Sequence, residues 1–71
     1  MNQSTAKSIL DDYLSLDRSV VAAMNNLRER LEGDELRTHQ RKVGMILMSI
    51  RDAMDLVVKE HPSLRPEGMT E

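Results

Sequence analysis

The sequence predicts an all-α protein, a two-helix antiparallel hairpin that dimerises into a four-helix bundle. Three observations support this fold class. Apolar residues recur every three or four positions along two long stretches, as they do on one face of a helix. A short polar break, Glu32-Gly33-Asp34, separates the two stretches. Tyr13 is the single aromatic residue, so the core must be aliphatic, which suits interlocking helices better than a β-sandwich.

The first helix is expected over residues 5–32, after a short lead of residues 1–4. Ser4 or Thr5 is suited to cap it, because a hydroxyl oxygen accepts hydrogen bonds from the free N–H groups of the first turn. Apolar residues of this helix form a row whose pattern repeats every eleven residues. Such a row runs almost straight along the helix and is expected to face the second helix. It consists of Ile9, Tyr13, Leu16, Val20, Met24, Leu27 and Leu31.

The connection between the helices is predicted to be a turn at Gly33. Glycine after a helical pattern fits the left-handed position that ends many helices. Asp34 is expected to cap the second helix, and Glu35 to interact favourably with its N-terminal dipole. Helices joined by so short a turn are antiparallel neighbours.

The second helix is expected over residues 34–61, ending before Pro62, because proline disfavours a helical conformation in the residue before it. The run from Val43 to Met54 is long enough for a buried strand, but helical spacing continues on both sides of it and favours a helix. Residues 62–71 are expected to be a disordered tail. The inward row consists of Leu36, Val43, Ile50 and Val57, with Leu47, Met54, Ile46 and Ala53 beside it.

Further apolar residues lie off these inward rows, and they suggest a function. A chain of 71 residues without cysteine has no disulfide to stabilise it, so a homodimer is expected. The surplus apolar surface either closes that dimer or binds a larger protein. The favoured function is a small non-catalytic regulator (adaptor, anti-activator or inhibitor) that masks a surface on its partner. The partner-binding residues expected are Leu10, Leu14, Val21, Met45 and Met48.

The alternative function is nucleic-acid binding by a basic cluster near the turn. In shape alone, without a matching motif, the predicted hairpin resembles small RNA-binding helical hairpins of the plasmid Rop type. Acidic residues such as Glu29 and Glu32 dilute the cluster, and no aromatic residue accompanies it for base stacking. The candidate nucleic-acid-binding residues are Arg28, Arg30, Arg37, Arg41 and Lys42.

No catalytic, cofactor or metal site is expected from the sequence, and an all-helical enzyme is the least favoured reading. The chain has no glycine-rich phosphate loop, no HExxH and no nucleophile motif. Glu35 and His39 are four residues apart and could share a metal ion, but charged helices contain many such pairs by chance. The net charge is −2, and neither a signal peptide nor a membrane-spanning stretch is recognisable. A cytoplasmic protein without membrane contact is expected.

Overall fold

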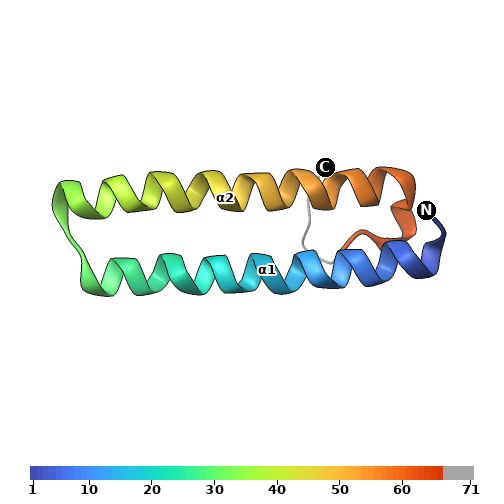
Figure 1. The fold of residues 1–71 in the computed structure, drawn as a ribbon, viewed down its shortest axis with the longest axis horizontal. Coiled ribbons are helices and arrows are strands. Elements are labelled where there is room, and N and C mark those ends of the chain that lie inside the picture. Colours follow the sequence, from blue (N-terminus) through green and yellow to red (C-terminus); the bar gives the residue numbers. More distant parts are fainter. Residues whose placement is uncertain (67–71) are drawn as a thin grey trace.

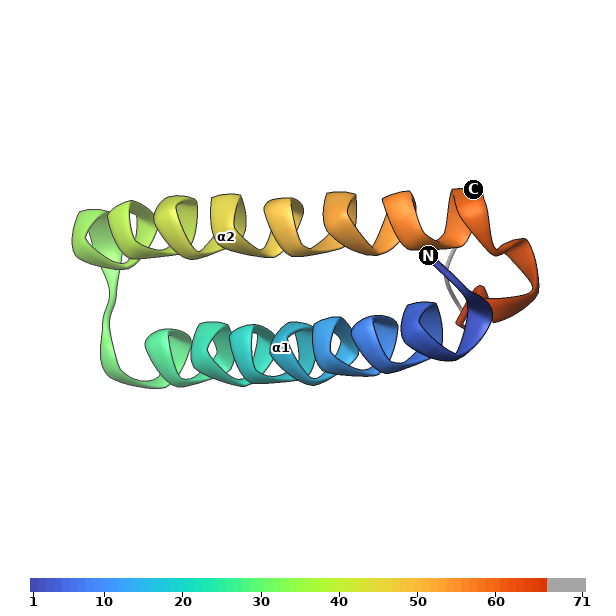
Figure 2. The same ribbon diagram turned by 45° about the vertical axis from the view of Figure 1, so that its right-hand side comes forward.

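The computed structural model describes residues 1–66 and contains two long helices followed by one turn of 3-10 helix. These are α1 (Gln3–Arg30), α2 (Gly33–Glu60) and η1 (Pro62–Leu64). The two long helices lie antiparallel and side by side, with the connecting turn at one end (Figure 1), and the turned view shows the same arrangement (Figure 2). The predicted all-helical hairpin is therefore confirmed.

Helix α1 begins two residues before the expected start at residue 5. The side chain of Asn2 accepts a hydrogen bond from the backbone N–H of Thr5 at 2.8 Å, so Asn2 is the N-cap and neither Ser4 nor Thr5 has that role. At the other end the helix stops at Arg30, and Leu31 still donates its N–H to the carbonyl oxygen of Leu27 at 2.9 Å. The expectation that Ser4 or Thr5 caps α1 is therefore wrong. Asparagine is as good an N-cap as serine, so capping preference alone does not select between these residues.

The turn consists of two extended residues and a left-handed glycine. Leu31 and Glu32 are extended, and Gly33 has φ of +63°, the left-handed conformation expected for it. Gly33 is also the first residue of α2, so Glu32 occupies the N-cap position, without a side-chain hydrogen bond. The expectation that Asp34 caps this helix is wrong. Asp34 and Glu35 instead lie within the first turn, where their charge favours the helix dipole.

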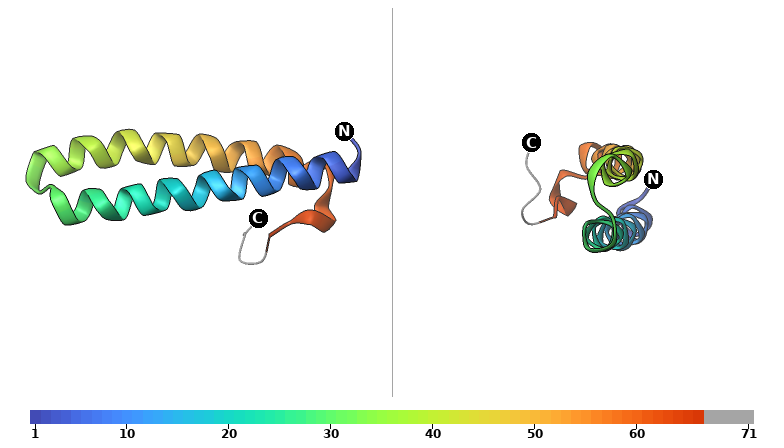
Figure 3. Two further views of the ribbon diagram at one scale, coloured as in Figure 1. Left: turned by 60° about the horizontal axis from the view of Figure 1, so that its bottom comes forward. Right: turned by 90° about the vertical axis from the view of Figure 1, so that its left-hand side faces the viewer.

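Residues 62–64 return over the hairpin. They were expected to begin a disordered tail, but they form η1, and Leu64 packs against the core. The end-on view shows η1 on one side of the pair of helices (Figure 3, right). The apolar side chain of Leu64 gives this segment a reason to pack. Residues 67–71, the rest of the expected tail, lie outside the described residues.

The core lies at the end of the hairpin where η1 returns. Leu64 and four other apolar side chains, Ile9, Tyr13, Leu14 and Ile50, pack against the buried residues. Toward the turn, apolar residues on the inward rows, such as Leu27 and Leu36, are only half-buried. The buried residues are Ala6, Leu10, Met54, Val57 and Val58.

The inward rows differ from the predicted rows at four positions. Leu16 and Ile46 are 51% and 54% exposed, although both were placed on or beside an inward row. Leu10 and Val58 were placed off those rows and are 3% and 0% exposed. Leu64 of η1 packs against the cluster that contains Leu10 and Val58, whereas Leu16 and Ile46 lie outside this cluster.

Two sets of polar contacts join the helices. In the middle, Arg51 donates from Nε to a carboxylate oxygen of Asp17 at 2.9 Å, and this hydrogen bond, with the charge of Asp17, raises the pKa of Arg51. At the open end, the ammonium group of Met1 lies 2.7 Å from Oε1 of Glu60 and lowers the pKa of that carboxyl group. His61 Nε2 also lies 3.0 Å from the carbonyl oxygen of Met1.

Within residues 1–66, neither α1 nor α2 combines the length and the apolar character that crossing a membrane requires.

Candidate protein-binding surface

The most exposed large apolar side chains of α2 lie on the side that faces away from α1. Met45 is 59% exposed, Met48 66% and Leu56 70%. Consecutive residues of a helix are about 100° apart, so these three share one side, opposite the core residues Met54 and Val57. We call this side the outer stripe, and its members are Arg41, Met45, Met48, Asp52 and Leu56.

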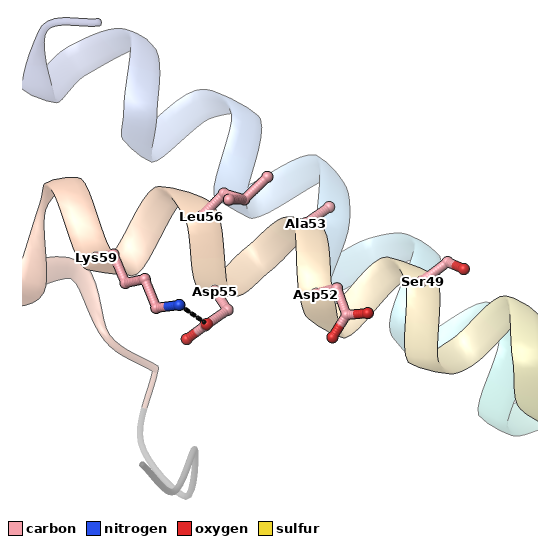
Figure 4. A pocket seen from close by; sticks show the side chains of 6 residues that line it. All are labelled: Ser49, Asp52, Ala53, Asp55, Leu56 and Lys59. Atoms are coloured by element: carbon pink, nitrogen blue, oxygen red, sulfur yellow. Dashed lines mark ion pairs between the residues drawn. The ribbon is translucent and has the colours of Figure 1, made fainter.

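The far end of the outer stripe borders a shallow, open depression. Figure 4 shows that all six side chains lining it come from consecutive turns of α2. The ammonium group of Lys59 pairs with Asp55 at 3.0 Å along one edge. A depression formed by one helix cannot enclose a small molecule, whereas it can lie against another helix. The lining residues are Ser49, Asp52, Ala53, Asp55, Leu56 and Lys59.

Arg41 and Asp52 are the charged residues of the outer stripe, one on each side of the two methionines. Both are exposed, and neither forms an ion pair with any other residue of the described part of the chain. By contrast, their neighbours Arg37 and Asp55 are paired within α2, with Asp34 and Lys59 respectively. The guanidinium of Arg41 and the carboxylate of Asp52 are therefore available to a binding partner.

The five predicted partner-binding residues do not form one surface. Leu10 is buried in the core, so its assignment to a partner is wrong. Leu14 is half-buried and packs against the core as well. Val21 is 37% exposed on α1, apart from the outer stripe on α2. Met45 and Met48 are exposed together, as the sequence predicted.

Leu56 is a member of this surface that the list of candidate residues omitted. Its position off the inward row of α2 was visible in the sequence. Leu16 and Ile46 add further exposed apolar area, but they flank the contact between the helices and do not lie on the outer stripe.

The hairpin gathers the predicted basic residues around the turn. Arg28 and Arg30 lie in the last turn of α1, and Arg37 follows in the second turn of α2. Arg41 and Lys42 lie one turn farther along, and all five side chains are exposed. Two of the five are engaged locally: Arg28 donates to Asn25 Oδ1 at 3.2 Å, and Arg37 lies 3.6 Å from the carboxylate of Asp34.

The polar and charged side chains of residues 1–66 all remain in contact with solvent. Among these residues, no group of three or more His, Asp or Glu side chains is placed to hold a metal ion. Glu35 and His39, the pair noted in the sequence, are both exposed to solvent.

Comparison of the chain with protein-family models, with curated proteins and with solved structures gives no match. The surface of the hairpin itself is therefore the basis for a functional proposal.

Proposed function

We propose that this protein is a small, non-catalytic, cytoplasmic regulator that binds a larger protein and masks a surface on it. Such a protein acts as an adaptor, an anti-activator or an inhibitor. The observation that supports the proposal is the outer stripe, where Met45, Met48 and Leu56 are each more than half exposed on one side of α2. Contiguous exposed apolar side chains typically mark interaction sites.

The chemistry of the outer stripe suits a helix that lies in an apolar groove. Anchors at helical spacing on one side of a helix are the usual form of this recognition. Methionine is common at adaptable binding surfaces because its unbranched side chain fits irregular pockets. Full burial of one such side chain contributes roughly 1.5–3 kcal/mol, so three of them give a partner a substantial gain.

We also propose that two hairpins pair into a homodimer of four helices. Among residues 1–66 five are buried, all toward the open end of the hairpin, which is a small core for a chain of 71 residues. The chain has no cysteine to supply a disulfide. Pairing of helical surfaces is a common way for so small a chain to gain stability.

The proposal is tested by capturing partners from a lysate of the protein's own cell or host with the tagged Met48→Asp variant. A carboxylate in the middle of the stripe must be desolvated on binding, so we expect the captured protein to be lost. Leu16→Asp is the matched control: it places the same charge at an exposed leucine of α1, outside the stripe, and should retain capture. Circular dichroism shows whether each variant is helical. Undiminished capture by a folded Met48→Asp variant would contradict the proposal.

A second candidate, binding of RNA or DNA, is favoured by the gathering of basic residues around the turn. The test is the double variant Arg28→Glu with Arg37→Glu, which leaves the outer stripe unchanged. If the turn binds nucleic acid, the affinity should fall steeply with added salt, and the double variant should show both weaker binding and a shallower salt dependence. Capture that survives nuclease treatment would favour a protein partner.

A further inference from the structure

Four of the five members of the outer stripe, Arg41, Met45, Met48 and Asp52, have the same spacing when they are read in either direction. From Arg41 to Met45 is four positions, from Met45 to Met48 three, and from Met48 to Asp52 four. The two inner positions carry the same residue, and the two outer positions carry opposite charges. A two-fold axis between two antiparallel helices brings each residue against the residue at the mirrored position, so this arrangement makes the facing pairs complementary.

We propose that the outer stripe binds the same stripe of a second copy, with the two α2 helices antiparallel. A two-fold axis between Met45 and Met48 places Met45 against Met48 of the partner subunit. The same rotation places Arg41 against Asp52 of the partner subunit, and each pairing occurs twice. The proposal specifies how the homodimer forms: the two α2 helices lie at its centre, and the two α1 helices lie outside.

The charge pattern extends this match along the helix. The same rotation opposes Asp34 to Lys59 of the partner subunit, and Thr38 to Asp55 of the partner subunit. Asp34 and Lys59 each also pair within their own α2, with Arg37 and Asp55, so these positions add to the match less than Arg41 and Asp52 do. Leu56 meets the position of Arg37, whose aliphatic stem can cover it. No two like charges oppose each other at these positions. A second copy therefore supplies complementary charges along the stripe, which a purely apolar partner would not supply.

The position of the two-fold axis also favours a second copy. The point midway between Met45 and Met48 coincides with the middle of α2, which runs from Gly33 to Glu60. Two α2 helices centred there overlap over their whole length, about 40 Å at 1.5 Å per residue. Arg41 and Asp52 form no ion pair within the described part of the hairpin, so pairing between copies breaks none at these two positions.

This inference rests on the homodimer proposed above, and it uses the same stripe that is proposed to bind a larger protein. The dimer covers Met45 and Met48, so self-association and capture of the larger protein compete. The homodimer is then the form that persists when the partner is absent, and the partner must displace one copy to bind the other.

Charge reversal tests the pairing by sedimentation equilibrium, at low ionic strength and across the micromolar range. Wild type should be a dimer. Arg41→Asp and Asp52→Arg each place two like-charged pairs in the interface, and each should weaken dimerisation about tenfold or more. Mixing the two variants should restore a dimer that contains one copy of each, because every opposed pair is again complementary. The double variant, with both substitutions in one chain, should also dimerise.

Matched controls are charge reversals at exposed residues of α1, Arg18→Asp and Asp12→Arg, which should leave the wild-type dimer unchanged. The mixture guards against a folding defect, since misfolded chains would not recover on mixing.

A wild type that stays monomeric would overturn the inference, as would single variants that dimerise like wild type or a mixture that forms no heterodimer. A monomeric wild type that still captures a larger protein would leave the proposed function standing. A dimeric wild type that captures nothing would support the inference and contradict the proposed function.

Discussion

The two ends of the hairpin differ in how well their apolar side chains are covered. At the open end, where η1 returns, Leu10 and Val58 are 3% and 0% exposed. At the turn end the same two helices face each other through Leu27 and Leu36, and both are only half-buried. The composition of the facing rows is similar at the two ends. The difference is the third segment, η1, which is present at one end only.

This comparison shows what two helices cannot do alone. Two packed helices bury a narrow strip of side chains along their line of contact. The side chains on either flank of this strip remain open to water. A third element that covers one flank completes the burial, and here a single turn of 3-10 helix is enough. At the turn end, the flanks remain free to be covered by another chain.

The largest expected effect is the contrast between equivalent leucines at the two ends. Leu10→Ala leaves a cavity in the packed end and should lower the free energy of unfolding by about 3 kcal/mol. Leu27→Ala removes a side chain that is partly hydrated already and should cost about 1 kcal/mol. Urea denaturation followed by circular dichroism measures both. Equal losses would mean that the two ends are covered alike in solution.

A smaller loss of stability is expected when the apolar side chain of η1 is shortened. Leu64→Ala removes the side chain of η1 that packs against the core and should cost about 1–2 kcal/mol. Ser63→Ala, its exposed neighbour, is the control and should change stability by less than about 0.5 kcal/mol. In a double variant with Leu10→Ala, the losses should not add, because both changes affect one cluster. Strict additivity would show that Leu64 does not contact this cluster.

The smallest effects concern two glycines, for which the same substitution should have opposite signs. Gly33 is left-handed and its added Cβ would meet no atom within 4 Å, so Gly33→Ala costs only backbone strain, about 1 kcal/mol. Gly44 lies inside α2 with equally open space, so Gly44→Ala should stabilise the protein by about 0.5–1 kcal/mol. Thermal unfolding measures both shifts. A loss at Gly44 would indicate that this glycine allows a close approach that the single hairpin does not contain.

Much of the fold follows from local sequence signals. The helical spacing, the glycine at the turn and Pro62 after the second helix place both helices to within two residues of their ends. Met45 and Met48 were also identified as exposed, because the opposite side of α2 already had its core residues. These predictions succeed because they depend only on residues that lie close together in the chain.

The errors arise where distant residues decide the outcome. The position of Leu10 on its helix does not reveal that η1 will return over it. Val58 belongs to the same buried cluster, against which Leu64 packs, whereas Leu16 is exposed. For the cap of α1, three suitable side chains lie within four residues, and only the geometry of the first turn selects Asn2. The binding role of the outer stripe remains a proposal, since it depends on a second molecule.

The location of the core at the open end also has a consequence for how the chain folds. Contacts beside the turn join residues that are close in sequence, so they are the quickest to form. The cluster of Leu10, Val57 and Val58 joins residues from opposite ends of the chain and is expected to form last. Stabilising contacts that form after the transition state slow unfolding and leave the folding rate almost unchanged. The hairpin therefore starts to fold at its weaker end, and its lifetime is set by its stronger end.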